Sequence, residues 1–389
     1  MNLYLRLVFK LFLSLVFVTE AALFLEPSLS GITLLIKVPL ILIMAFITIR
    51  LMTLRYFYEN KHLLFLLGIF TYSLILVPFS KFPSIAFTAS LKLGYFFLMI
   101  TSFIYLIQQN IIRFNDLRFL VILAFIIFIP VGIYMTLFPA VEHLAQVGPS
   151  YTLLWIVIMA VFLLNKNDYL MRILIVLAIL TILISFKRGA VVCLILSFLV
   201  YGFLLLYKQL TMRRLTYFFI VPFLILALGL SALNINGDFI IDRLLDADGS
   251  GREMIYLLIF NALGDASIFQ LFFGHGFLEA QIHIGEALGI RTGAQLGLQA
   301  HSDWLTLLFE QGFIGFILFV GFHSAFFWDI RSARDSRVLY RKSLAFYASL
   351  FIISFFSEIL FTAQYAFLAI IIATVTSFTI NFKRAKYQQ

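Results

Sequence analysis

The stretch YLMRILIVLAILTILISFKRGAVVCLILSFLVYGFLLL, residues 169–206, consists of two long apolar runs separated by the basic turn Lys187-Arg188-Gly189. A helix needs about 20 apolar residues to cross a hydrocarbon core of about 30 Å, and each run approaches that length. We therefore predict a membrane hairpin of two helices, 169–186 and 189–207. Cys193, the only cysteine, lies inside the second run, which excludes a disulfide within one chain and a cysteine-based metal site.

Apolar runs of this kind recur along all 389 residues, of which 63% are hydrophobic and 12% charged. An ordinary globular domain has about 25% charged residues, so the composition predicts an all-α polytopic integral membrane protein with a single membrane domain, 1–389. We predict twelve transmembrane helices: 3–25, 31–50, 62–79, 85–112, 117–138, 150–165, 169–186, 189–207, 215–233, 313–328, 343–358 and 362–381. The first run also resembles a cleaved signal peptide, but its apolar stretch continues to Leu25, so we expect an uncleaved helix.

The basic residues predict the orientation of the chain. Cytoplasmic loops of membrane proteins carry an excess of Lys and Arg, and most of the 28 such residues here fall on one side when the N-terminus is cytoplasmic. Both termini are then cytoplasmic, and the connection 234–300 is a long periplasmic loop with short helices. Because the net charge of +9 is spread over short loops, we expect no nucleic-acid partner.

Some basic residues lie instead in or near the predicted outer half of the membrane. A charge at membrane depth costs at least about 2.5 to 3.5 kcal/mol, so these residues need partners or a bound anion. Glu20 is placed to neutralise one of them, and for Lys37 and Lys92 the alternative is that each amine reaches the outer headgroups. These exceptions are Lys37, Lys81, Lys92, Lys187, Arg188, Arg243, Arg252 and Arg291.

Two of these arginines fall at predicted outward helix starts. Ser250 and Glu253 form a capping-box pattern before a short helix that ends at Gly264, which places Arg252 in its first turn. Arg188 begins the helix that follows the Lys187 turn. Helix starts offer free N–H groups and a positive dipole, and an arginine fork binds two phosphate oxygens. We predict a pyrophosphate clamp, the alternative being solvated or headgroup-facing arginines.

The stretch AHSDWLTLLFEQGFIG, residues 300–315, adds a polar group on the same side. Ser302 or Asp303 is expected to cap a short helix that Gly312 terminates. His301 then lies at a helix start, where the dipole disfavours protonation and a neutral imidazole can accept a proton. The alternative is a histidine that only caps or anchors. We expect no metal site, because His275 and His283 have few carboxylates near them and no HExxH pattern occurs.

In their order and common side, these features resemble the O-antigen polymerase and O-antigen ligase superfamily, with an arginine in a short outer turn, an SGR arginine in a long loop, and an HSDWL segment opening the next span. The resemblance covers residues 184–320. It implies a GT-C-like glycosyltransferase of the bacterial inner membrane, working on the periplasmic side without cofactor, metal or nucleotide sugar. The implied partners are an undecaprenyl-pyrophosphate-linked oligosaccharide, an acceptor glycan (a lipid-linked repeat unit or lipid A core), membrane lipids and a chain-length regulator protein.

By this resemblance, Arg188 and Arg252 would hold the donor pyrophosphate, and His301 would be the base of an inverting displacement. Four of the other outer cations, Lys37, Lys92, Lys187 and Arg243, would attract the anionic donor. The motif details favour a polysaccharide repeat-unit polymerase, with an O-antigen ligase as the alternative. A lipid-linked glycan flippase or transporter and a non-catalytic scaffold are weaker alternatives, since the polar residues gather towards one face rather than along a full crossing path.

Overall fold

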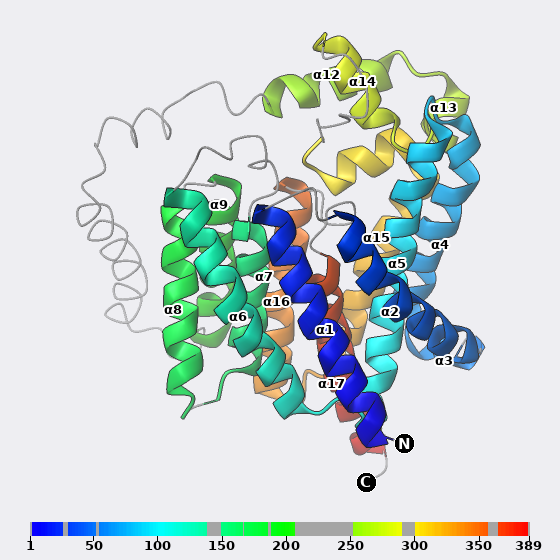
Figure 1. The fold of residues 1–389 in the computed structure, drawn as a ribbon. Helices are drawn as coiled ribbons and strands as arrows, with labels where there is room; N and C mark the ends of the chain where they lie inside the picture. The colour runs from blue at the N-terminus through cyan, green and yellow to red at the C-terminus, as the bar shows by residue number, and fades with distance from the viewer. Residues whose placement is uncertain are drawn as a thin grey trace.

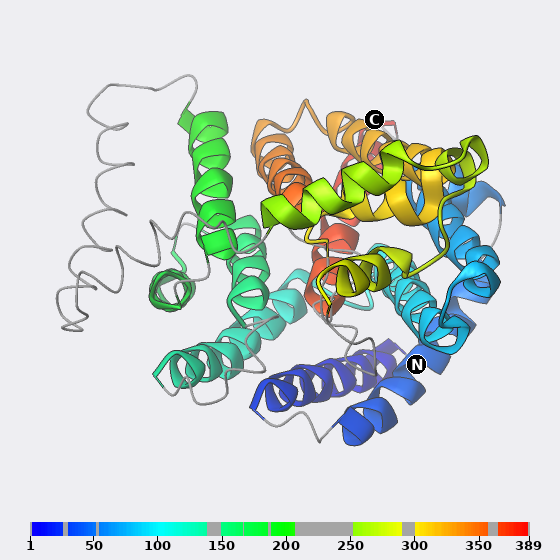
Figure 2. The ribbon, with the colours of Figure 1, turned by 90° about the horizontal axis from the view of Figure 1, so that it is seen from above.

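The protein is a bundle of long helices in the computed structural model (Figure 1), which describes residues 2–25, 30–51, 54–137, 149–165, 167–185, 188–206, 252–289, 300–356 and 365–387. Throughout these ranges the regular structure is helical, which confirms the predicted all-α class. The two termini lie at one end of the bundle, and the short helices α12, α13 and α14 lie across the other end (Figures 1 and 2). We call these the terminal end and the α12 end.

The long helices follow each other up and down between the two ends. They are α1 (Asn2–Leu25), α2 (Ser30–Leu51), α4 (Lys61–Leu76), α5 (Pro83–Gln108), α6 (Phe114–Leu137), α7 (Pro149–Leu163), α8 (Tyr169–Ile184), α9 (Arg188–Leu206), α15 (Asp303–Arg331), α16 (Arg337–Phe356) and α17 (Tyr365–Tyr387). The short ones are α3 (Leu54–Glu59), η2 (Val77–Phe79), α12 (Arg252–Gly264), α13 (Ile268–Phe273) and α14 (Glu279–Ala287). Each predicted span has its helix here except 215–233, which lies outside the described residues.

Among the described residues, 6 helices are long and apolar enough to cross a membrane: α1, α4, α5, α6, α15 and α16. Helices α7, α8, α9 and α17 contribute shorter apolar segments. The chain is therefore a multi-pass membrane protein, as its composition predicts. The total of twelve spans and the assignment of the terminal end to the cytoplasm stay predictions.

Helix α17 lies inside the bundle, surrounded by the other helices (Figure 2). Every residue from Ala366 to Ser377 is buried, including the hydroxyl residues Thr374 and Thr376. Such hydroxyls are tolerated in a membrane core because they find acceptors, and Thr374 Oγ1 donates to Ile370 O at 2.6 Å. Helix α17 is thus the central helix of the bundle, and the outer helices pack against it.

A buried polar link ties three helices together at the terminal end. His62 of α4 is fully buried, and its Nδ1 lies 2.7 Å from Asp329 Oδ2 of α15. Its Nε2 lies 3.4 Å from Thr376 Oγ1 of α17. Because both ring nitrogens have partners on other helices, the link holds α15 in register with α4 and α17.

Helix α15 is bent sharply at Gly312, whose φ of 61° and ψ of −160° are not helical. In a straight helix, Trp304 and His323 would lie about 28 Å apart along the axis. Their ring centroids are 5.4 Å apart, and that of Phe319 is 4.8 Å from Trp304. Segment 303–311 therefore folds back against segment 313–331. The predicted helix break at Gly312 is confirmed, but the fold-back has no signal in the sequence.

Candidate active site

The fold-back of α15 places its first residues inside the α12 end of the bundle. Ser302 is buried and caps the helix by accepting a hydrogen bond from Leu305 N at 3.4 Å. Asp303 is buried as well. His301 precedes the cap, is half-buried, and has a left-handed backbone with φ of 56°, which is uncommon for a residue other than glycine. The predicted position of His301 at a helix start is confirmed.

Trp304 fastens this helix start to the end of α16. Its indole Nε1 donates a hydrogen bond to Ser354 Oγ at 2.7 Å. Its ring stacks on Phe355 with centroids 5.0 Å apart. A half-buried indole that is both stacked and hydrogen-bonded has little freedom to move, so the backbone of His301 is held in place relative to α16.

A small cavity lies beneath this helix start. Asp303 and Ser354 are polar members of its lining, and Phe96 of α5 is one of the apolar members. His323 also faces it, and neither ring nitrogen of His323 has a hydrogen-bond partner among the described residues. The sequence analysis did not single out His323, whose place beside the site depends on the fold-back of α15.

The loop after α13 holds the bend of α15. The bend leaves the carbonyl groups of Phe309 and Glu310 without their usual helical partners. The loop replaces them, because His275 N donates to Phe309 O at 3.0 Å and Gly276 N donates to Glu310 O at 3.2 Å. The His275 ring stacks on Phe309 with centroids 4.2 Å apart. These contacts give His275 a structural role, and among the described residues no group of three or more His, Cys, Asp or Glu is gathered as a metal site.

Helix α12 brings Arg252 alongside His301. Arg252 is its first residue, as predicted. Tyr256 lies one turn later on the same helix face, and its hydroxyl oxygen lies 3.4 Å from His301 O and 3.4 Å from Phe355 O. The structure thus adds Tyr256 to the site, a residue that only its spacing from Arg252 distinguishes in the sequence.

Helix α9 begins at the same end of the bundle (Figure 1). Arg188 is its first residue, as predicted. Helix α9 runs antiparallel to α16, and one pocket is lined by Ser197 of α9 and Ser349 of α16. Continuing this register towards the α12 end sets Arg188 level with the end of α16 at Phe356, because the rise per residue is the same in both helices. The side chains of Arg188 and Arg252, and the whole of Lys187 and Arg243, lie outside the part of the chain that the structure describes.

The two lysines predicted at membrane depth differ in their surroundings. Lys37 Nζ of α2 lies 3.1 Å from Glu20 Oε1 of α1, so the expected neutralisation by Glu20 applies to this lysine. Lys92 of α5 lies one turn before Phe96, which lines the cavity beneath Asp303. Lys37 therefore has a partner in the protein, while Lys92 is exposed; their binding of substrate stays a prediction.

Comparison with known proteins gives a family match for the segment that carries these residues. Residues 173–320 match the family model described as O-antigen ligase. This segment includes most of α8, all of α9, α12, α13 and α14, and the fold-back of α15, so it contains each predicted catalytic residue. No curated protein sequence matches the chain. The predicted resemblance is confirmed, and this family consists of glycosyltransferase-like enzymes that act as polymerases or ligases on lipid-linked glycans.

Proposed function

We propose that this member of the O-antigen polymerase and ligase superfamily transfers a glycan from undecaprenyl pyrophosphate to a sugar hydroxyl at the α12 end of the bundle. The observation that supports it most is that α12 and α15 both contact the end of α16 near their own starts, while α9, which begins with Arg188, packs along the same helix. We assign this end to the periplasmic side of a bacterial inner membrane. A lipid-linked donor enters such a site from the bilayer without leaving its lipid environment.

The two arginines would hold the leaving group. Arg188 and Arg252 each begin a helix, so each combines a guanidinium fork with free backbone N–H groups and a positive dipole. The departing undecaprenyl pyrophosphate gains negative charge in the transition state. Groups placed in advance towards that charge lower the barrier without needing to reorganise.

His301 would accept the proton of the acceptor. The acceptor oxygen forms a bond to the anomeric carbon from the face opposite the pyrophosphate, and the bond from that carbon to the phosphate oxygen breaks. The hydroxyl proton passes to an imidazole nitrogen of His301, and the displacement inverts the anomeric configuration. General base catalysis of this type contributes about 10²- to 10⁴-fold. Tyr256 and Trp304 would keep His301 in position.

The acceptor defines two candidate activities. We favour a repeat-unit polymerase, which moves the growing chain onto a lipid-linked repeat unit. A ligase, which moves it onto lipid A core, is the second candidate, because the matched family model is described as O-antigen ligase. Both activities use the same donor chemistry.

Reconstitution of the purified protein with an undecaprenyl-pyrophosphate-linked repeat unit tests the proposal. A ladder of products from the donor alone identifies a polymerase. A product that forms only when lipid A core is added identifies a ligase. Intact donor in both reactions, from protein that remains folded and monodisperse, contradicts the proposed transfer.

A further inference from the structure

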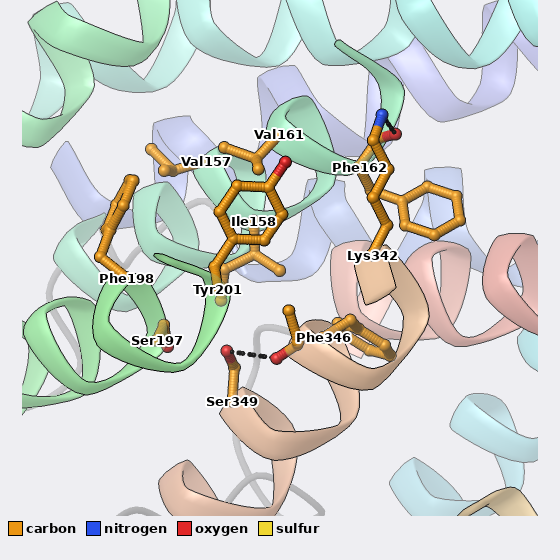
Figure 3. Close-up of a pocket in the computed structure, with 11 residues that line it drawn as sticks. Val157, Ile158, Val161, Phe162, Ser197, Phe198, Tyr201, Lys342, Phe346 and Ser349 are labelled. Atoms are coloured by element: carbon orange, nitrogen blue, oxygen red, sulfur yellow. Dashed lines mark hydrogen bonds between the residues drawn. The ribbon is translucent and has the colours of Figure 1, made fainter. Parts of the chain in front are cut away.

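A second pocket lies between α7, α9 and α16 in the half of the bundle nearer the terminal end (Figure 3). Its lining combines valine, isoleucine, alanine and phenylalanine side chains with four polar residues, Ser197, Tyr201, Lys342 and Ser349. Lys342 lies little more than one turn from the start of α16, whereas the candidate active site lies at the other end of that helix. The pocket is therefore separate from the site of glycan transfer.

The protein provides hydrogen-bond acceptors for part of the Lys342 ammonium group. Its Nζ donates to Phe162 O at 2.8 Å and to Leu164 O at 3.2 Å, at the end of α7 where the helix dipole is negative. An ammonium group has three donors. Two are used by these carbonyls, so one remains for a ligand in the pocket that Lys342 lines.

Ser197 provides an independent indication of a ligand. It is only 6% exposed, and its Oγ has no hydrogen-bond partner among the residues that the structure describes. Ser349, on the facing helix, is satisfied by Ala345 O at 2.9 Å. A buried hydroxyl without a partner is unfavourable, so Ser197 calls for a molecule that carries a hydrogen-bonding atom into an otherwise apolar pocket.

The sequence that precedes Lys342 indicates a negative charge on that molecule. The turn between α15 and α16 and the first turns of α16 are rich in arginine, and Lys342 follows directly. Basic clusters next to a membrane helix attract anionic lipid headgroups. These arginines are Arg331, Arg334, Arg337 and Arg341.

We propose that the pocket binds an anionic phospholipid of the adjoining leaflet. Its phosphate is held by Lys342 and the Tyr201 hydroxyl, and an acyl chain fills the apolar lining. Ser197 lies one helical turn, about 6 Å, deeper than Tyr201, at the depth of an ester carbonyl of the same lipid. A polyprenyl chain has no acyl ester carbonyl to satisfy Ser197, so the pocket chemistry favours a glycerophospholipid. Because the lipid contacts both α9 and α16, its binding stabilises the packing of these two helices. Arg188 is the first residue of α9, at the opposite end of this packing contact from the pocket.

Native mass spectrometry and thermal unfolding of the full-length protein test this inference. The purified protein is compared in micelles with added phosphatidylglycerol, phosphatidylcholine or undecaprenyl phosphate. We expect phosphatidylglycerol adducts of the protein to survive delipidation. The Tm of the protein with phosphatidylglycerol should exceed its Tm with phosphatidylcholine by about 2 to 4 °C. The difference between lipids is the relevant quantity, because it cancels any direct effect of a substitution on stability.

Two variants and one control locate the binding. Lys342→Met removes the charge, and Ala345→Leu fills the pocket while the Lys342 bonds remain; both are expected to abolish the preference for phosphatidylglycerol. Arg113→Met removes an exposed basic residue between α5 and α6, outside the pocket lining, and is expected to keep the preference. Equal Tm values with the two phospholipids overturn the proposal. A preference that survives in Lys342→Met and Ala345→Leu, or stabilisation by undecaprenyl phosphate alone, overturns it equally.

Discussion

The backbones of Gly274 and Gly312 lie against each other without room for a side chain on either residue. A Cβ on Gly312 would lie 2.6 Å from Gly274 N, and one on Gly274 would lie 2.1 Å from Glu310 O. Both glycines have positive φ angles, 88° and 61°. This contact holds the bend of α15, and the bend sets His301 at the α12 end of the bundle.

Substitution of Gly312 by alanine is therefore expected to open the bend and abolish transfer. Alanine in the backbone conformation of Gly312, which essentially only glycine adopts, costs about 1 to 3 kcal/mol, and its Cβ meets backbone atoms that cannot move aside. Thermal unfolding and turnover of the purified variant measure both effects. Gly264→Ala is the matched control, because a Cβ at Gly264 meets nothing within 4 Å. Wild-type turnover in Gly312→Ala would contradict the role of the bend.

His301 is best tested by substitution with asparagine rather than alanine. Asparagine tolerates the left-handed backbone of this position but does not act as a base, so a loss of activity reports on the imidazole. We expect turnover to fall about 10²- to 10⁴-fold with donor binding retained. His283→Asn, a similar change on α14, serves as the control and is expected to stay active. An active His301→Asn variant rules out His301 as the base.

The two arginines at helix starts are expected to act through donor binding. Arg188→Ala and Arg252→Ala should each weaken binding of the pyrophosphate donor by about 10- to 100-fold. Lysine should restore little, because a point charge cannot replace a fork that contacts two oxygens. Binding is measured with labelled donor in nanodiscs, and Arg334→Ala at the terminal end is the control. Unchanged donor affinity in both alanine variants would contradict the proposed pyrophosphate clamp.

Tyr256 is expected to position His301 rather than take part in the reaction. Loss of its hydroxyl in Tyr256→Phe removes one long hydrogen bond, worth about 1 kcal/mol, so turnover should fall about fivefold with little change in donor affinity. Tyr56→Phe loses a hydroxyl that donates to Thr101 O at 3.0 Å on α5, and is the control. If Tyr256→Phe lowers donor affinity and leaves kcat intact, the hydroxyl contacts the substrate instead.

Substitution of His323 distinguishes a structural role of this residue from a catalytic role. Its ring is buried among aromatic side chains, and its nitrogens have no partners in the described part of the chain. Phenylalanine keeps the ring contacts and removes the unsatisfied nitrogens, so His323→Phe should raise Tm without lowering turnover. A higher Tm together with lost activity would show that the cavity beneath Asp303 takes part in transfer.

Hydropathy and charge were sufficient to predict most of the helices and the side on which the site residues gather. These signals are local, because each span must contain enough apolar residues and each helix start needs its own cap. Arg188 and Arg252 accordingly begin their helices as predicted. Gly312 also breaks its helix as predicted, since the break depends on one residue.

The sequence alone thus determined a multi-pass helical protein with arginine-bearing helix starts and a histidine before a capped helix. Only the tertiary structure decided that α15 folds back, that the loop at His275 supports the bend, that Lys37 pairs with Glu20, and that Tyr256 reaches His301. The physical reason is that these contacts join residues far apart in the chain. Their formation depends on how whole helices pack, and hydropathy and local spacing carry no information about that packing.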